Sequence, residues 1–236
     1  MKYLVWDFDG TLGYRQNGLW SAALMEILQR YKPDCRATID QVRSYLKTGF
    51  PWHTPERPHP DIKTPEQWWD ALDGLFVTAY LGLGLNLADA SHLAKQVRHL
   101  YPKATEWRLY DDVLPVLSQL SAAGWTHLVL SNHVPELRQI TRHLSLDQYL
   151  AGVFNSAETG YEKPHPQAFR NLLLTLDNIE SIWMIGDSLD ADIAGAREAG
   201  IDGILVRKQH PGVKYSCLTL YDIEAIVDEN TEGETQ

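Results

Sequence analysis

The chain has 236 residues, of which 44% are hydrophobic and 22% are charged, and its net charge is −10. This size is sufficient for a full hydrophobic core and a second, smaller domain. The sequence contains no run of roughly 18 apolar residues, so no transmembrane helix is expected. The acidic balance argues against a nucleic-acid-binding surface, which requires a basic patch.

The first part of the chain reads as one strand followed by helices. Residues 3–6 form an apolar run that ends abruptly at Asp-Phe-Asp-Gly, which predicts a buried strand with a functional turn at its carboxyl end. Apolar spacing and start and stop signals predict the helices that follow, at residues 19–31, 38–48, 65–81 and 87–101. Five prolines in residues 51–65 predict a loop there. We therefore expect a helical segment from residue 14 to about 105 without a convincing strand.

From residue 110 onward, helices and short apolar strands alternate. The predicted helices span residues 111–123, 134–143, 165–176 and 190–199, and the predicted strands span 126–130, 152–155, 181–185 and 203–206. This alternation is typical of a doubly wound α/β fold with a parallel sheet. Because the first strand lies at 3–6, we expect an α/β domain of residues 1–13 and 105–236, with a helical domain of residues 14–104 inserted in it. The acidic, polar last dozen residues predict disorder.

Four aspartates follow two of these strands. Asp7 and Asp9 come directly after the first strand, and Asp187 and Asp192 come after the strand at 181–185. In a parallel sheet, active sites lie beyond the carboxyl ends of the strands, so the four carboxylates are expected to converge on one pocket. Such a pocket requires positive charge. It indicates a hard divalent cation, Mg²⁺, and a negatively charged substrate.

Four segments in this order carry a family resemblance: DFDGT, LSN, GYEKPHP and GDSLDADI. Together they resemble the signature segments of the haloacid dehalogenase superfamily of phosphohydrolases. The resemblance covers residues 2–13 and about 105–210, and the helical segment lies where that family places a helical cap. It implies a Rossmann-like core, Mg²⁺ as cofactor and a small phosphorylated metabolite as substrate.

The resemblance implies separate roles for the first two aspartates. Asp7 is the expected nucleophile, because an ionised carboxylate can attack phosphorus directly and form an aspartyl-phosphate. Asp9 is the expected general acid and base, with a pKa raised by neighbouring carboxylates. The dehalogenase members lack an Asp at that position because halide needs no protonation, so Asp9 favours the phosphatase branch.

The remaining site residues are also implied by the resemblance. The phosphate-binding residues are expected to be Gly10, Thr11, Ser131, Asn132 and Lys163, of which Ser131 and Lys163 also assist catalysis. The metal is expected to bind Asp7, Asp187 and the backbone carbonyl of Asp9. Asp192 is expected to support the metal-bound waters or to orient Lys163.

Several other polar and aromatic residues favour structural roles. Asp190 reads as a helix N-cap or a solvated group. The histidines at 53, 59 and 165 match no zinc spacing, and the two cysteines, Cys35 and Cys217, match no metal spacing. Most aromatic residues of the helical segment are expected to pack its interior, namely Trp52, Trp68, Trp69 and Tyr80. The first candidates for substrate specificity are Trp20, Trp52 and His53. For Arg15, a position over the site and a position facing solvent are equally consistent with the sequence.

The expected function is Mg²⁺-dependent hydrolysis of a small phosphomonoester. The enzyme is expected to be cytoplasmic, with reduced thiols, and to be a monomer or a dimer. Neither nucleic acid nor a membrane is an expected partner. Two alternatives belong to the same superfamily. One is a phosphomutase, and the other is a phosphonate hydrolase, which needs a Schiff-base lysine from the helical segment, for which the candidates are Lys32, Lys47 and Lys63. The alternative of another class is a non-catalytic binding or regulatory module.

Overall fold

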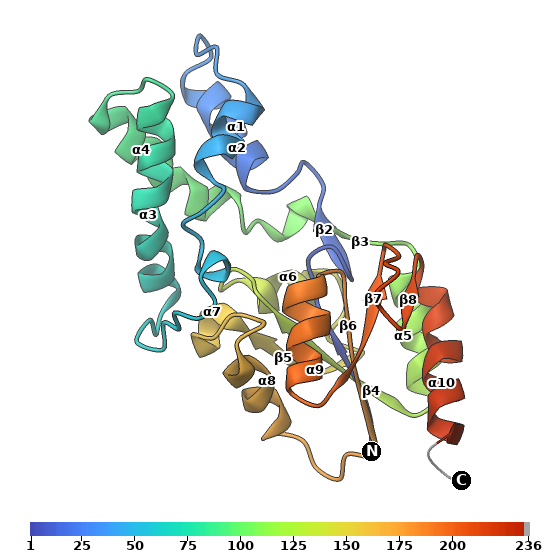
Figure 1. Cartoon of the computed structure of the whole chain (residues 1–236). Helices are drawn as coiled ribbons and strands as arrows, with labels where there is room; N and C mark the ends of the chain where they lie inside the picture. Colours follow the sequence, from blue (N-terminus) through green and yellow to red (C-terminus); the bar gives the residue numbers. More distant parts are fainter. Residues whose placement is uncertain (234–236) are drawn as a thin grey trace.

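The computed structural model describes residues 1–233 and shows a parallel sheet flanked by helices, with a separate group of helices beside it (Figure 1). Within these residues the main sheet has six strands in the order β5-β4-β1-β6-β7-β8. The strands are β1 (Lys2–Trp6), β4 (Trp125–Ser131), β5 (Leu150–Asn155), β6 (Ser181–Gly186), β7 (Asp202–Val206) and β8 (Ser216–Cys217). All pairings among them are parallel. The predicted α/β fold class is therefore confirmed.

The central strand β1 is buried on both faces. Leu4 and Trp6 belong to one hydrophobic cluster, whereas Tyr3 and Val5 belong to the cluster on the opposite face. Successive side chains of a strand point to opposite faces, so a continuous apolar run is what a strand covered on both sides requires. Its register aligns the strand ends that form the site, because Trp6 lies opposite a residue of β4 and a residue of β6.

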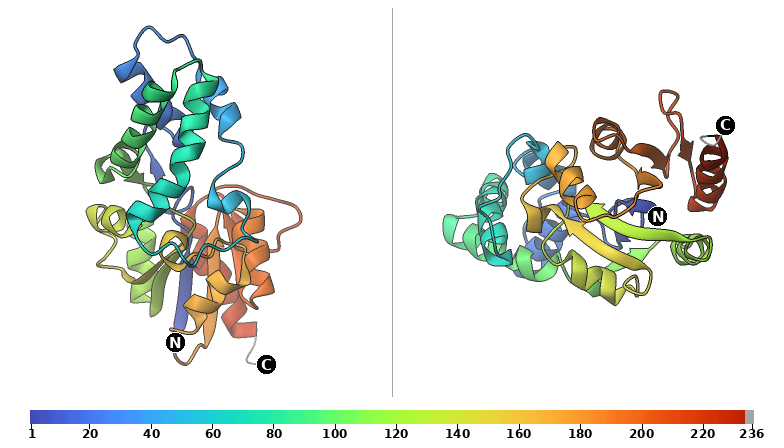
Figure 2. Two further views of the ribbon diagram at one scale, coloured as in Figure 1. Left: turned by 90° about the vertical axis from the view of Figure 1, so that its left-hand side faces the viewer. Right: turned by 90° about the horizontal axis from the view of Figure 1, so that it is seen from below.

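Helices cover both faces of the sheet (Figure 2). They are α5 (Val113–Ala122), α6 (Leu137–His143), α7 (Ser156–Thr159), α8 (Pro166–Leu173), α9 (Gly195–Glu198) and α10 (Ile223–Gly233). Short 3₁₀ turns occur at η1 (Pro51–His53), η2 (Ala104–Glu106) and η4 (Leu220–Asp222). The carboxyl ends of the strands face the helical segment (Figure 1).

The helical segment contains α1 (Trp20–Tyr31), α2 (Ile39–Tyr45), α3 (Pro65–Gly82) and α4 (Leu87–Leu100). Local sequence determines where these helices begin. Thr64 accepts a hydrogen bond from the Gln67 amide in a capping box, with Pro65 as the first helical residue. All four predicted helices of this segment are present, although α2 ends at Tyr45 and is shorter than expected.

Three short strands were not predicted, namely β8 and two strands outside the main sheet. β2 (Gly13–Arg15) pairs antiparallel with β3 (Trp107–Leu109), and the two together form the double connection between the α/β part and the helical segment. The expectation of no strand after residue 14 was therefore wrong at the start of the segment. The division at residues 13 and 105 stays a prediction.

The region after β6 and the end of the chain also differ from expectation. The predicted helix at 190–199 is a π-helical turn, η3 (Leu189–Ala194), followed by α9. The predicted disorder of the last dozen residues was wrong up to Gly233, because α10 begins at Ile223 and buries Ile223 and Val227 completely. The last three residues of that prediction, 234–236, lie outside the described residues.

None of the helices in residues 1–233 combines the length and apolar character that a membrane crossing requires. Cys35 and Cys217 are both free thiols.

Candidate active site

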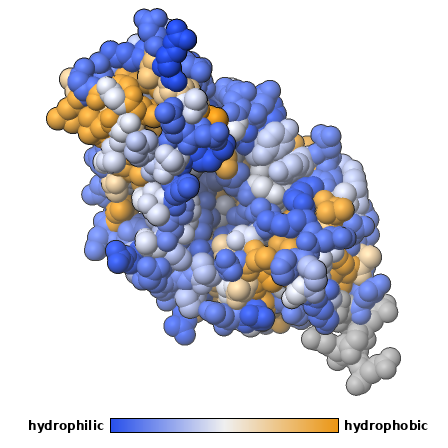
Figure 3. Space-filling model, turned by 45° about the horizontal axis from the view of Figure 1, so that its top comes forward, coloured by the Kyte–Doolittle hydropathy of each residue, from blue (hydrophilic) through white to orange (hydrophobic). Residues whose placement is uncertain are grey.

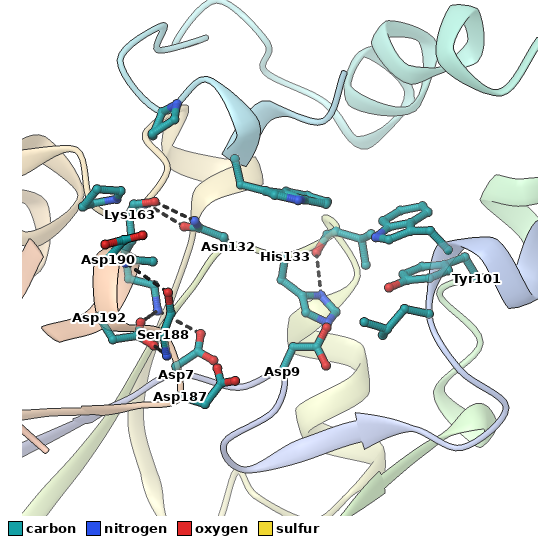
Figure 4. A pocket seen from close by; sticks show the side chains of 17 residues that line it. Asp7, Asp9, Tyr101, Asn132, His133, Lys163, Asp187, Ser188, Asp190 and Asp192 are labelled. Carbon is teal, nitrogen blue, oxygen red and sulfur yellow. Dashed lines mark hydrogen bonds and ion pairs between the residues drawn. The ribbon is translucent and has the colours of Figure 1, made fainter. Parts of the chain in front are cut away.

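A cavity of about 530 Å³ lies between the carboxyl ends of the central strands and the helical segment. The surface is hollowed where these two parts of the molecule meet (Figure 3). Figure 4 shows Lys163, Asp192, Asp7 and Asp187 gathered on one side of this cavity, with Asp9, His133 and Tyr101 on the other. The sequence-predicted polar residues from three strand ends are therefore brought together.

Asp7 lies at the floor of the cavity with only 7% of its surface exposed. Its amide donates a hydrogen bond of 2.8 Å to the carbonyl of Ile185, which fixes the backbone at the end of β1. Its Oδ1 accepts hydrogen bonds from Ser131 Oγ at 2.9 Å and from Lys163 Nζ at 2.8 Å. The carboxylate is thus fixed in one orientation, as a nucleophile requires.

Lys163 is buried and donates to three acceptors. Its ammonium contacts Asp7 Oδ1 at 2.8 Å, Asp192 Oδ1 at 2.6 Å and the carbonyl oxygen of Leu130 at 2.7 Å. Burial alone would lower the pKa of this ammonium, but Asp192 and Asp7 raise the pKa above its ordinary value. Lys163 therefore carries a fixed positive charge beside the carboxylate of Asp7.

Asn132 directly follows β4 and holds the backbone of Lys163. Its Oδ1 accepts from the amide of Lys163 at 2.7 Å, and its Nδ2 donates to the carbonyl of Lys163 at 2.9 Å. Both polar groups of the side chain are engaged, and the expected role of Asn132 as a phosphate ligand stays a prediction. The geometry makes Asn132 a positioning residue for Lys163.

Asn132→Ala is expected to lower kcat/KM about 10- to 100-fold, as for the loss of other groups that orient a site residue. Two polar groups of the Lys163 backbone would lose their partners, which costs about 1–3 kcal/mol in the free energy of unfolding. Steady-state kinetics and urea unfolding check both effects. Unchanged kinetics in this variant would contradict the positioning role.

The π-helical turn η3 directs Asp192 back toward the sheet. Asp192 is 1% exposed; its Oδ1 accepts from Lys163, and its Oδ2 accepts from the amide of Ser188 at 2.9 Å. This approach requires a glycine at the end of β6, because a Cβ at Gly186 would collide with the Asp192 carboxylate. Both oxygens of Asp192 thus serve the protein itself, which agrees with the predicted role of orienting Lys163.

The carboxylate of Asp187 lies close to two others. One ligand atom from each of Asp7, Asp187 and Asp192 lies within 4.8 Å of the others. Burial and the charge of Asp7 raise the pKa of Asp187, and Lys208 opposes this shift from 3.4 Å. Such a cluster of hard oxygen donors fits Mg²⁺.

Gly10 and Thr11 form the turn after β1. The amide of Gly10 donates to the carbonyl of Gly13 at 2.8 Å, and the amide of Thr11 donates to the carbonyl of Phe8 at 3.3 Å. Both amides are therefore engaged within the turn, and the expected contacts of these residues with phosphate stay a prediction. Gly10 is required at this turn for space and conformation: its φ is +85°, and a Cβ there would lie 3.0 Å from the Asp187 carboxyl carbon.

The pKa of Asp9 indicates an acid–base function. Burial, reinforced by the charges of Asp7 and Asp187, raises its pKa from 3.8 to about 7. A carboxyl group that titrates near neutral pH can both donate and accept a proton there. This agrees with the acid and base role that the sequence predicts for Asp9.

In the metal-free protein, Asp9→Asn is expected to be more stable than the wild type at pH 8. Between pH 4 and 7 the folded state binds more protons at Asp9 than the unfolded state, so wild-type stability falls as pH rises through this window. The advantage of the variant should grow by about 2–3 kcal/mol between pH 5 and 8. Urea unfolding with a chelator measures it, and Asp190→Asn is the control for removing an acidic group. A constant difference across this range would contradict the assignment.

The other residues considered in the sequence fall into two groups. Trp20 and Trp52 line the cavity, as does Asp190, whereas His53 is absent from its lining. Ser188, rather than Asp190, caps η3.

Structural roles account for the remaining candidates. His59 contacts Glu162 through Nε2 at 3.1 Å, and His165 accepts from the amide of Gln167 at the start of α8. Arg15 is buried at the base of the helical segment, where it donates to the carbonyls of Gly18 and Tyr101.

Sequence reasoning missed several residues of the cavity wall, among them His133 and Tyr101. His133 directly follows Ser131-Asn132, so its place after a strand end was a usable signal. Tyr101 follows α4 and is separated by more than 90 residues from the aspartates after β1, so no local pattern connects it with the site. Burial, with the nearby charge of Asp9, raises the pKa of the Tyr101 hydroxyl.

Comparison with known proteins identifies the family. Residues 1–200 match the haloacid dehalogenase-like hydrolase family, so the chain belongs to it. The solved structure of the HAD-hydrolase YfnB from Bacillus subtilis, bound to magnesium, superposes with a TM-score of 0.72 at 19% identity, covering 96% of this chain and 98% of that one. A 2-haloacid dehalogenase from Pseudomonas syringae gives a TM-score of 0.67 at 20% identity, covering 97% and 99%. These likenesses confirm the fold.

Two relatives with similar sequences carry the names of phosphatases or hydrolases. A ribulose-1,5-bisphosphate 5-phosphatase from Halopiger xanaduensis is 36% identical over 42% of this chain and 43% of its own length. A haloacid dehalogenase-like hydrolase domain-containing protein 3 from Xenopus laevis is 28% identical over 61% of this chain and 59% of its own. The chain thus spans about two-fifths to three-fifths of the length of these relatives.

Proposed function

We propose that this protein is a Mg²⁺-dependent phosphohydrolase that cleaves a small phosphomonoester through an aspartyl-phosphate on Asp7. The observation that supports this most strongly is the fixed carboxylate of Asp7, held by Lys163 and Ser131 at the floor of a cavity that also contains Asp9. The phosphatase names of several relatives support the same reaction class.

The donor set supports Mg²⁺ as the cofactor. Asp7 and Asp187 would hold the ion, together with the backbone carbonyl of Asp9, and Asp192 would remain bound to Lys163. When bound, the ion supplies positive charge near the phosphoryl oxygens. This role of the ion also explains how three carboxylates tolerate one another within 4.8 Å.

The residues divide the reaction into two steps. In the first step a carboxylate oxygen of Asp7 attacks phosphorus, the bond from phosphorus to the leaving oxygen breaks, and Asp9 gives that oxygen its proton. In the second step the Asp9 carboxylate takes a proton from water, which attacks phosphorus and releases phosphate and free Asp7. Lys163 offsets negative charge in both steps, because its ammonium stays beside Asp7.

The helical segment is proposed to act as a cap that excludes water and selects the substrate. Three of its aromatic residues, Trp20, Trp52 and Tyr101, form part of the cavity wall. The phosphonate-hydrolase alternative loses support here, because Lys163 is the only lysine among the described residues that line the cavity. One of its candidates, Lys32, pairs with Asp89 at 2.7 Å.

The purified protein is expected to release phosphate from a generic aryl phosphate in the presence of Mg²⁺. Chelation should stop the release, and added Mg²⁺ should restore it, because the clustered carboxylates need a cation to admit an anionic substrate. Phosphate release measured with a colorimetric assay checks this. Failure to turn over any phosphoester while Mg²⁺ is bound would favour the non-catalytic binding module instead.

A further inference from the structure

The upper wall of the cavity is apolar and aromatic, in contrast to its floor. The cavity volume of about 530 Å³ falls within the ~300–1,000 Å³ typical of small-molecule sites and leaves space for more than a phosphoryl group. The residues of this wall are Leu19, Trp20, Trp52, Pro55, Tyr101 and Val134. Whatever is attached to the phosphate therefore lies against these side chains.

The aromatic rings of this wall are held as fixed flat surfaces. Trp20 stacks on Tyr101 with ring centroids 3.6 Å apart and planes 7° apart, and it stacks on Phe76 at 5.7 Å. Trp52 stacks on Phe50 with centroids 4.7 Å apart and planes 6° apart. The Trp52 and Trp20 rings are 6.0 Å apart. Fixed aromatic faces favour a planar partner by offset stacking.

The cavity has no free cation for a second anionic group. Of the described residues that line it, Lys163 alone is basic, and its ammonium already contacts Asp7 and Asp192. Two basic side chains outside the lining are engaged as well: Arg15 bonds the carbonyl of Gly18 at 2.9 Å, and Lys208 contacts Asp187 at 3.4 Å. A carboxylate or second phosphate on the leaving group would therefore lie against the apolar wall without a cation to neutralise it.

His133 offers a neutral hydrogen-bonding atom at this wall. The side chain is 4% exposed, and its Nε2 has no hydrogen-bond partner in the described part of the chain. Burial lowers the pKa of the imidazole to about 4, so the ring is uncharged at neutral pH. Such a group can bond a neutral polar atom but does not neutralise an anion.

We propose that the site takes the monophosphate of a planar aromatic or heteroaromatic alcohol without a second anionic group. This inference rests on the proposed phosphohydrolase function and narrows its substrate class. It distinguishes the chain from the relative named for ribulose-1,5-bisphosphate, whose name implies a second anionic group on the substrate.

The test compares phosphate esters of primary alcohols, so that the leaving groups have similar intrinsic reactivity. The set is benzyl phosphate, pyridylmethyl phosphate, glycerol 3-phosphate, phosphoserine and ribulose 1,5-bisphosphate. The expected kcat/KM is at least about tenfold higher for the two ring esters than for phosphoserine and the bisphosphate, a factor that one good stacking contact supplies. A preference for either of the doubly anionic esters would overturn the inference and leave the phosphohydrolase function intact.

Binding separates the two proposals if no ester is hydrolysed. Calorimetry with benzylphosphonate and with phosphonoacetate, in the presence of Mg²⁺, measures the same preference without turnover. Tighter binding of benzylphosphonate supports the planar-ring site, and tighter binding of phosphonoacetate contradicts it. Absence of hydrolysis by itself counts only against the phosphohydrolase function.

Two variants of the wall locate the preference. Trp52→Leu should raise KM for benzyl phosphate about three- to tenfold more than KM for glycerol 3-phosphate, and Trp52→Phe, which keeps a ring, should largely restore it. Leu19→Lys adds a cation to the wall and should shift the preference toward phosphoserine. Equal effects of Trp52→Leu on both esters would show that the ring has only a structural role and would overturn the inference.

Discussion

Asp7→Asn is expected to lower the rate of phosphate release at least about 10,000-fold, the scale of loss when a nucleophile is removed from a preorganised site. The amide oxygen of Asn can still accept the hydrogen bonds that Ser131 and Lys163 donate to Asp7. The variant should therefore fold, with a free energy of unfolding within about 1 kcal/mol of the wild type or above it. Single-turnover kinetics and urea unfolding measure the two quantities.

The control for this variant is Asp190→Asn, which removes a carboxylate from the mouth of the same cavity. It is expected to keep most of the activity, because Asp190 is exposed and bonds none of the reacting groups in the described structure. Turnover by Asp7→Asn at a rate near that of the wild type would show that another group attacks phosphorus.

Lys163→Met is expected to damage both activity and stability. It removes the cation that lies 2.8 Å from Asp7 and 2.6 Å from Asp192, so two buried carboxylates lose their partner. The expected costs are about 3–5 kcal/mol in the free energy of unfolding and about 1,000-fold or more in kcat, the scale of losing an electrostatic group at the reacting centre. Denaturant unfolding and steady-state kinetics measure them.

The double variant Lys163→Met/Asp192→Asn separates these effects. Removing the second charge should recover at least about 2 kcal/mol of stability, because contacting charged groups are strongly coupled. Activity should stay low, because the positive charge beside Asp7 is still absent. Recovery of activity together with stability would mean that Lys163 serves only to neutralise Asp192.

The parts of the fold that are readable from sequence are those with strong local signals. Residues 3–6 are apolar without interruption because both faces of β1 are covered, and such a run followed by polar residues marks a central strand and its functional end. The limits of α3 follow from Thr64, Pro65 and Gln67, which form its first turn. Once the strands are placed, the parallel topology itself brings Asp7 and Asp187 to one edge.

The missed elements are those that depend on distant partners. β2 and β3 have three residues each and exist because Gly13–Arg15 meets Trp107–Leu109 across the helical segment. The acidic helix α10 buries Ile223 and Val227. Two buried positions do not give a clear amphipathic pattern in the sequence. The π-helical turn that directs Asp192 depends on the space at Gly186 and on the contact with Lys163.

The site shows the same division. The aspartates follow strand ends, and Lys163 follows β5 and the short helix α7. Their gathering at one site was predictable, whereas the bonding of individual groups was not. Asn132 faces the Lys163 backbone because a strand end and a turn 31 residues away converge. The aromatic wall formed by Trp20 and Tyr101 is a contact between the start of α1 and the end of α4, which only the folded helical segment creates.

The most direct test of the aspartyl-phosphate on Asp7 is to trap the phosphorylated enzyme. Wild-type protein mixed with substrate and Mg²⁺ is quenched in acid, treated with borohydride and digested, and the peptides are sequenced by mass spectrometry. Borohydride reduces an aspartyl-phosphate to homoserine, so homoserine is expected at position 7 only when substrate is present. Steady phosphate release without modification of Asp7, or with modification of a different residue, would contradict it.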